Sequence, residues 1–233
     1  MIKRKRLGQH FLNSNSVARL IVSEAKIDKK DTVLEIGTGQ GILTPLLCEN
    51  AKKVISIEAD KDLYQEAKSR FKHIENLVLH LGDGFKNNDE FTVFVSNLPY
   101  SKSKDAIEWL AQKRFSHGII MVQKEFADKL LAKSSKERRA VSVIANHVLD
   151  IRKVSQVSKN NFNPPPKVDS VILEIVKKRT IDKMLIKTIN KIFSYRRKTI
   201  PNIFKQFGKK ILLDKRLDDL SGEEIINLAK KIV

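Results

Sequence analysis

A strand-like segment that runs directly into three alternating glycines is the feature that most restricts how this chain can fold. Residues 31–36 (DTVLEI) have the apolar pattern of a buried strand, and Gly37, Gly39 and Gly41 follow. A helix is predicted to begin near Ile42. A strand, a glycine turn and a helix N-terminus let backbone come close to a nucleotide-like ligand. The spacing is GxGxG rather than GxGxxG, so the motif needs support from the rest of the chain.

Further apolar segments, separated by predicted helices, indicate a doubly wound α/β sheet. These strands are predicted over residues 53–58, 76–81, 90–96 and 117–123, with a last one over 171–176. In such a sheet the ligand binds at the carboxyl ends of the strands. Glu58, at the end of the second strand, is placed to hold two ribose hydroxyls, or it is a surface glutamate. Asp83, between two glycines, is placed to accept from an adenine amine, or it forms an ordinary turn.

The fourth predicted strand ends in the sequence Asn97-Leu98-Pro99-Tyr100. The Asn97 carboxamide offers an acceptor and a donor, and Pro99 stiffens the backbone and leaves the Leu98 carbonyl free to accept. Tyr100 offers an aromatic surface on which a base can stack. Together these groups suit a planar amine on a heterocycle, such as N6 of adenine. The alternative is an ordinary Asn-x-Pro turn.

Two aromatic segments lie outside the predicted sheet. His10 and Phe11 follow Gly8, and they either close over a ligand or belong to a docked N-terminal arm. Three prolines at residues 164–166 predict a stiff loop that holds Phe162 against the opposite face of a base. A proline turn before the last strand is compatible with that role.

The charge balance favours a polyanionic partner. The chain has 45 Lys and Arg against 27 Asp and Glu, a net charge of +18, which indicates nucleic acid or an acidic membrane face, or a protein that is simply basic. Residues 133–139, with Lys129 just upstream, form a basic segment that is either a solvated loop or a backbone-binding one. Cys48 is the only cysteine and no apolar run approaches a membrane span, so we expect a cytoplasmic protein. The five histidines have no metal-ligand spacing.

The C-terminal quarter of the chain is helical in pattern and more basic than the rest. Residues 178–233 hold 15 Lys and Arg against 6 Asp and Glu. Three helices are predicted: one over residues 181–193, a second with Pro201 near its start, and a last one that the capping box Ser221–Glu224 opens. The excess charge indicates a small helical domain, residues 179–233, that grips a phosphate backbone, next to a ligand-binding domain of residues 1–178.

Motifs in the same order and spacing give the chain a resemblance to a known family. They are residues 8–12 (GQHFL), 35–41 (EIGTGQG), Glu58, Gly82-Asp83, 97–100 (NLPY) and 162–170 (FNPPPKVDS). With these motifs the chain resembles the ribosomal RNA small-subunit adenine N6-dimethyltransferases, which are class I methyltransferases. Residues 193–198 (FSYRRK) followed by Asn202 resemble the C-terminal domain of that branch, and His10, where other members have Asn, resembles archaeal and eukaryotic members.

The resemblance implies a Rossmann-like class I methyltransferase sheet, S-adenosylmethionine as cofactor and no metal. It implies dimethylation of two adjacent adenosines near the 3′ end of small-subunit rRNA by a monomer that acts on a pre-30S-type particle, without a membrane partner. The implied cofactor-binding residues are His10, Leu12, Gly37, Gly39, Glu58, Ala59, Asp83, Gly84 and Asn97. The implied catalytic residues are Asn97, Leu98, Pro99, Tyr100 and Phe162, and the implied RNA-binding residues are Arg196, Arg197 and Lys198.

The residues themselves suggest the chemistry. The Asn97 side-chain oxygen and the Leu98 carbonyl can accept the two N6 hydrogens, which favours a tetrahedral nitrogen aimed at the methyl donor. Tyr100 and Phe162 would sandwich a base taken out of its stack. Two alternatives stay open: an adenine methyltransferase that acts on DNA or large-subunit RNA, and a non-enzymatic RNA chaperone or transcription factor. Intact glycines, Glu58, Asp83 and Asn97 argue against the second.

Overall fold

The computed structural model describes residues 10–132 and 137–233. The basic tail at residues 3–6, Gly8-Gln9 of the N-terminal motif, and residues 133–136 of the basic segment lie outside this part. The described residues divide into two compact units: residues 10–106, 114–127 and 151–177 form the first, and residues 107–113, 128–132, 137–150 and 178–233 form the second. The second unit therefore combines the predicted C-terminal region with segments from earlier in the chain.

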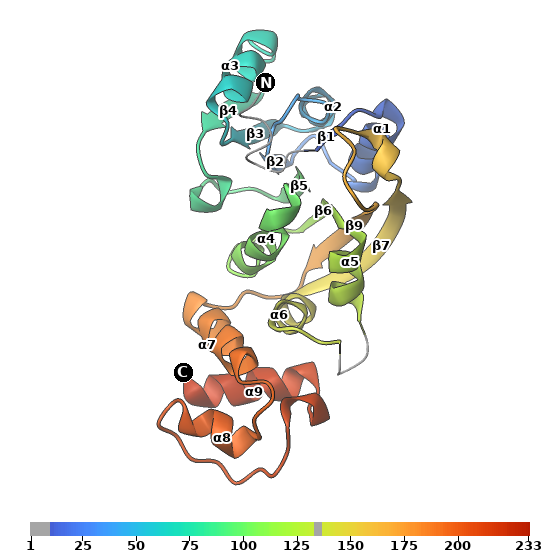
Figure 1. Cartoon of the computed structure of the whole chain (residues 1–233). Coiled ribbons are helices and arrows are strands. Elements are labelled where there is room, and N and C mark those ends of the chain that lie inside the picture. The colour runs from blue at the N-terminus through green and yellow to red at the C-terminus, as the bar shows by residue number, and fades with distance from the viewer. Residues whose placement is uncertain (1–9, 133–136) are drawn as a thin grey trace. The chain divides into compact units, whose positions relative to one another are not determined.

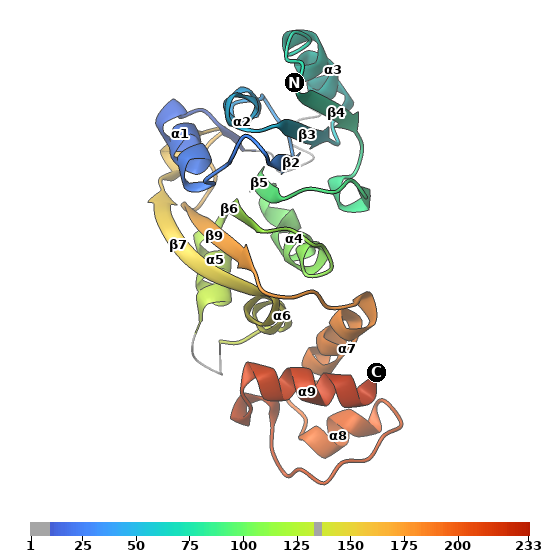
Figure 2. The ribbon, with the colours of Figure 1, turned by 180° about the vertical axis from the view of Figure 1, so that it is seen from behind.

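Within the described residues, seven strands form one sheet in the order β4-β3-β2-β5-β6-β9-β7 (Figures 1 and 2). They are β2 (Thr32–Ile36), β3 (Lys53–Glu58), β4 (Leu77–Leu81), β5 (Val93–Asn97), β6 (His117–Gln123), β7 (Leu149–Val157) and β9 (Ser170–Lys177). The pairs β3–β4, β2–β3, β2–β5 and β5–β6 are parallel, and β9 runs antiparallel to β6. The predicted doubly wound α/β fold is confirmed. The sequence analysis did not predict β7, in which the apolar residues Leu149, Ile151, Val154 and Val157 depart from strict alternation because two polar residues separate the later ones.

Helices cover the sheet and close a hydrophobic core. In the first unit they are α1 (Asn15–Glu24), α2 (Thr44–Asn50) and α3 (Lys61–Arg70), with short 3₁₀ turns η2 (Gly84–Lys86), η3 (Tyr100–Lys102) and η4 (Lys159–Asn161). Helix α2 packs on β3, and α3 packs on β3 and β4. Ala18, Ile21 and Val22 lie at helical spacing on α1 and join Val33 and Val95 of the sheet in one buried cluster. Burying this apolar face stabilises α1 far more than its intrinsic propensity does.

A two-stranded ribbon ties the N-terminal arm to the proline loop. Strand β1 (Phe11–Leu12) pairs antiparallel with β8 (Phe162–Asn163), so that Phe11 lies opposite Asn163 and Leu12 opposite Phe162. The Asn13 amide extends the ribbon by donating to the Asn161 carbonyl at 2.9 Å. Leu12 and Phe162 are buried in the core cluster. The arm therefore has a fixed register against a loop about 150 residues away in sequence.

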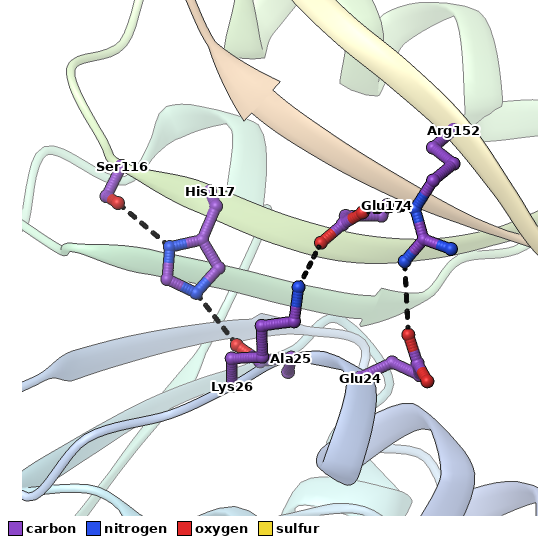
Figure 3. Close-up of polar contacts among 7 residues, drawn as sticks. All are labelled: Glu24, Ala25, Lys26, Ser116, His117, Arg152 and Glu174. Carbon is purple, nitrogen blue, oxygen red and sulfur yellow. Dashed lines mark hydrogen bonds and ion pairs between the residues drawn. The ribbon is translucent and has the colours of Figure 1, made fainter.

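A polar cluster fixes the end of α1 to the sheet (Figure 3). Glu174 on β9 accepts from Lys26 Nζ at 3.1 Å and from Arg152 Nε at 2.7 Å, and Arg152 also pairs with Glu24 at 3.2 Å. His117 Nε2 donates to the Ala25 carbonyl at 2.8 Å. The two cations lower the pKa of the Glu174 carboxyl through their hydrogen bonds and charge. These contacts anchor the helix that follows β1.

The second unit is built around packed helices. They are α6 (Ala140–Val148), α7 (Lys183–Ser194), α8 (Ile200–Lys205) and α9 (Gly222–Ile232), with the 3₁₀ turn η5 (Leu217–Asp219). Helices α4 (Ser103–Leu110) and α5 (Lys124–Leu131) contribute residues to both units. Helices α6, α7 and α9 pack on one another. The predicted capping box is present: Ser221 Oγ accepts from the Glu224 amide, and Glu224 Oε2 accepts from the Ser221 amide. No helix among residues 10–132 and 137–233 is both long and apolar enough to cross a membrane.

Candidate active site

The glycine turn lies at the carboxyl end of β2, where its three glycines adopt backbone conformations that other residues rarely take. Their φ angles are +89° at Gly37, +56° at Gly39 and +72° at Gly41. A Cβ on Gly41 would lie 2.5 Å from the Phe71 ring, so this glycine also makes room for α3 packing. The Arg70 guanidinium donates to the Gln40 carbonyl at 2.8 Å and holds the outer side of the turn.

Glu58, at the end of β3, is held against this turn. Its side chain is buried, with one oxygen accepting from the Gly39 amide and the other from the Asp60 amide, both at 2.8 Å. A carboxylate has about four lone-pair sites, so both oxygens can accept further hydrogen bonds. Its position at a strand end beside the glycine turn agrees with the predicted ribose-binding role, which stays a prediction.

Glu35 is a second carboxyl group in the pocket. It is only 1% exposed, and its Oε2 accepts from Thr44 Oγ1 at 2.7 Å and from Ser56 Oγ at 2.6 Å. Burial raises the pKa of Glu35 to about 7, and the two hydroxyl hydrogen bonds partly oppose that shift. A buried acid with such a pKa is a candidate functional group. The sequence pointed to it only as part of the motif EIGTGQG.

The Asn97–Tyr100 segment reaches the same pocket from β5. Asn97 is partly buried, and the Tyr100 hydroxyl is 2.7 Å from Ser170 Oγ. The Tyr100 ring stacks on His10, with ring centroids 5.6 Å apart and planes at 27°. His10 Nδ1 donates to the Pro164 carbonyl at 2.7 Å, which ties the N-terminal arm to the proline loop.

One pocket brings most of the predicted site residues together. The predicted residues that line it are His10, Leu12, Gly37, Gly39, Glu58, Asn97, Leu98, Pro99 and Tyr100. Those not found among its lining residues are Ala59, Asp83, Gly84 and Phe162. Phe11, which the sequence offered as closing over a ligand or as part of a docked arm, also lines it, and the lining residues that the sequence did not single out are Glu35, Thr38, Gln40, Ile42 and Leu43. The lining residues that the sequence missed therefore come from β2 and from the segment that follows it.

Phe162 requires a correction. We expected its ring to face a base opposite Tyr100, but the side chain is 3% exposed and packs in the core cluster with Leu12. Pairing of β8 with β1 turns this residue inward, because side chains alternate between the two faces of a strand. Stacking of a base on Phe162 is therefore not available in this structure.

Asp83 and Gly84 form a turn next to the pocket rather than part of its wall. Asp83 is exposed, and its Oδ1 accepts from the Phe85 amide at 3.0 Å, which caps η2. Gly84 is buried, and a Cβ there would lie 2.6 Å from the Ile36 side chain. The Gly-Asp-Gly turn that the sequence offered as an alternative is present, and contact of Asp83 with an adenine amine stays a prediction.

The predicted RNA-binding residues of the second unit differ in their surroundings. Arg196 is 22% exposed at its side chain and pairs with Asp218, with Nη2–Oδ1 at 2.9 Å and Nε–Oδ1 at 3.1 Å. Arg197 and Lys198 are exposed. An Arg whose charge is already paired contributes less to the attraction of a phosphate than an exposed one. Arg197 and Lys198 are thus better candidates than Arg196.

The family model for ribosomal RNA adenine dimethylases matches residues 2–232. The chain belongs to this family. Among its relatives is a ribosomal RNA small subunit methyltransferase A of Thermotoga neapolitana, 36% identical over 233 residues that cover 97% of this chain and 90% of that protein. The family expected from the motifs is confirmed.

One solved structure supports this family, and a second shares the fold. A dimethyladenosine transferase from Plasmodium falciparum has a TM-score of 0.80 and 30% identity, and covers 94% of this chain and 96% of its own. The 23S rRNA methyltransferase ErmE has a TM-score of 0.67 at 20% identity, covering 95% of this chain and 99% of its own. At that identity the likeness to ErmE shows the fold alone.

As a ribosomal RNA adenine dimethylase, the chain is a methyltransferase that uses S-adenosylmethionine. The pocket suits such a ligand chemically. Its lining includes two buried carboxyl groups, Glu35 and Glu58, which suit a molecule that carries an ammonium, a sulfonium and ribose hydroxyls, and Gly37 and Gly39 bring the backbone of the turn into the same lining. Across the described part of the chain, no group of His, Cys, Asp and Glu side chains is arranged to hold a metal ion.

Proposed function

We propose that this dimethylase transfers two methyl groups to N6 of each of two adjacent adenosines near the 3′ end of small-subunit rRNA, during ribosome biogenesis. The observation that carries the proposal is that Asn97, Leu98 and Tyr100 line the same pocket as the glycine turn and Glu58. A group that recognises an aromatic amine and a group suited to hold a nucleoside-type cofactor therefore meet at one edge of the sheet.

The Asn97 side-chain oxygen and the Leu98 carbonyl accept the two N6 hydrogens of the target adenine. These bonds draw the amine out of conjugation with the purine and direct its lone pair to the methyl donor. When bound, S-adenosylmethionine supplies the methyl group from an activated sulfonium. Each transfer would form an N6–methyl bond as the bond from sulfur to that methyl breaks and leaves a neutral thioether, and the positive charge then on N6 would be lost when N6 releases a proton to solvent. After the first transfer one hydrogen remains to be held for the second.

Other residues of the pocket hold the two substrates. Tyr100 provides a surface for a base that has left its stack. Glu58 accepts from ribose hydroxyls, and His10, Leu12, Gly37 and Gly39 surround the cofactor. Phe162 has no part in this proposal, because its ring lies in the core.

We also propose that the basic C-terminal region, residues 179–233, binds the phosphate backbone of the rRNA. Its excess of Lys and Arg and the exposure of Arg197 and Lys198 support this role. The substrate is a pre-30S-type particle, and the enzyme acts in the cytoplasm as a monomer. The single buried cysteine, Cys48, is compatible with a reducing compartment.

Asn97→Ala tests the amine contact. We expect it to abolish methyl transfer to undermethylated small subunits and to leave S-adenosylmethionine binding measurable by calorimetry. The exposed Asn50 at the end of α2 provides the control substitution, Asn50→Ala, which should retain wild-type transfer. Wild-type rates in Asn97→Ala would contradict the proposal.

The substrate is tested by offering labelled methyl donor with small subunits, large-subunit RNA or naked DNA, and then mapping the modified bases. The proposal requires label on adjacent adenosines of small-subunit rRNA. Preferential labelling of DNA or of large-subunit RNA would refute it in favour of those substrates.

A further inference from the structure

A hydroxyl–hydroxyl contact between two distant segments fixes the aromatic ring at the end of β5. The Tyr100 hydroxyl and Ser170 Oγ are 2.7 Å apart and 70 residues apart in sequence. On the basis of the proposed function, we propose that Ser170 is a positioning residue, which holds the hydroxyl end of the Tyr100 ring and so fixes the place of the ring on which the target adenine stacks.

The sheet places Ser170 at this point. Strand β6 lies between β5 and β9, with Asn97 opposite Met121 on one side and Gln123 opposite Ser170 on the other. Tyr100 follows three residues after Asn97, at the level where β9 begins. The phenol therefore reaches past the end of β6 to the first residue of β9.

Ser170 is a fixed support rather than an incidental partner. Its side chain is 0% exposed, and its position is set by the β6–β9 ladder and by the Lys124 amide, which donates to the Asp169 carbonyl at 3.0 Å. Asp169 is itself held, because its carboxylate accepts from the Lys159 amide and from Gln156 Nε2. A buried polar group without a partner is costly, so this hydroxyl favours the ring orientation that satisfies it.

The Tyr100 ring needs such a support. The phenol oxygen lies on the χ2 axis, so a bond to it fixes χ1 and the position of the ring's far end, whereas the ring plane is set by packing that includes the stacked His10 ring. The Tyr100 main chain is already held, since Ser103 Oγ donates to its carbonyl at 3.0 Å. Burial raises the pKa of the Tyr100 phenol, and the bond to Ser170 opposes this shift, which agrees with a phenol held in a partly desolvated place. A bond from the hydroxyl at the far end then fixes the direction in which the ring extends from the main chain.

Two substitutions break the same bond from opposite sides. Ser170→Ala removes the support, and Tyr100→Phe removes the hydroxyl but keeps the stacking ring. We expect each to lower kcat/KM for RNA about tenfold, the usual scale for a lost hydrogen bond of about 1.4 kcal/mol, with the Kd for S-adenosylmethionine unchanged. The double variant should be no worse than either single one, because both remove one interaction.

Either of two kinetic outcomes would overturn the proposal: wild-type kcat/KM in Ser170→Ala, or losses that multiply in the double variant. Ser142 provides a matched control, because it is also a buried serine (2% exposed) whose hydroxyl bonds the backbone at the start of α6. Ser142→Ala should lower the melting temperature and leave kcat/KM for RNA unchanged. If it lowers kcat/KM as Ser170→Ala does, the effect is one of stability and the positioning role fails.

A spectroscopic readout separates this inference from the proposed function. The chain has three tyrosines, so labelling of the ring carbon that bears the hydroxyl gives three NMR signals. Ser170→Ala should move the Tyr100 signal and leave those of Tyr64 and Tyr195 in place. An unmoved Tyr100 signal refutes the inference even if the wild type methylates rRNA. A wild type that methylates no RNA refutes the proposed function, whether or not the signal moves.

Discussion

Replacing Gly41 with alanine should destabilise the first unit through two separable effects. The φ angle of +72° is strained for any residue with a Cβ, which costs about 1–2 kcal/mol. The new Cβ would also lie 2.5 Å from two atoms of the Phe71 ring, and overpacking of this kind costs about 1–3 kcal/mol. We therefore expect Gly41→Ala to lower the free energy of unfolding by about 2–5 kcal/mol.

Gly208 supplies the control for backbone strain alone. Its φ is +69°, nearly that of Gly41, but no atom lies within 4 Å of a Cβ built there. Gly208→Ala should therefore cost about 1–2 kcal/mol, and the difference between the two variants measures the clash with Phe71. Combining Gly41→Ala with Phe71→Leu should be less destabilising than the sum of the single changes, since leucine removes the ring atoms concerned.

Urea unfolding followed by circular dichroism, with linear extrapolation, gives these free energies. The reasoning fails if Gly41→Ala costs no more than Gly208→Ala, or if Phe71→Leu gives no relief. Either result would mean that the ring moves aside freely and that Gly41 serves backbone conformation alone.

Three further predictions concern charged groups. In the folded chain burial raises the pKa of Glu35 to about 7, so this carboxyl keeps a proton that the unfolded chain loses from about pH 4.5. The free energy of unfolding should therefore fall as pH rises from 4.5 to 7, by on the order of 3 kcal/mol. Glu35→Gln should flatten this pH dependence, as measured by urea unfolding at a series of pH values. If the pH dependence of stability is unchanged in Glu35→Gln, Glu35 is not the group responsible for it. Glu58→Gln, which keeps the shape but offers fewer acceptors, should weaken S-adenosylmethionine binding about tenfold by calorimetry, and undiminished affinity would exclude the ribose contact. Neutralising Arg197 and Lys198 together should weaken RNA binding and reduce the slope of log K against log salt concentration by about 2. Arg196→Ala should change this slope little, because the Arg196 guanidinium is paired with Asp218. Equal changes of slope per charge removed would contradict the distinction between Arg196 and the other two residues.

Much of the fold follows from local pattern. The strand predicted over residues 53–58 is β3, and the one predicted over 117–123 is β6. Because parallel strands end at a common edge of the sheet, the order of the strands along the chain is enough to predict that Glu58 and Asn97 lie at one pocket. The glycine turn was equally predictable, since its spacing follows a buried strand. These features depend on residues close together in sequence.

Tertiary structure decided which way individual side chains face and what they contact. Phe162 lies in the core because β8 pairs with β1, and Arg196 is paired because η5 brings Asp218 beside it. Ser170 meets Tyr100 only because β9 enters the sheet antiparallel, next to β6. The physical reason is that period and propensity determine an element and its faces, whereas a side chain's partner depends on which distant segment packs against that face.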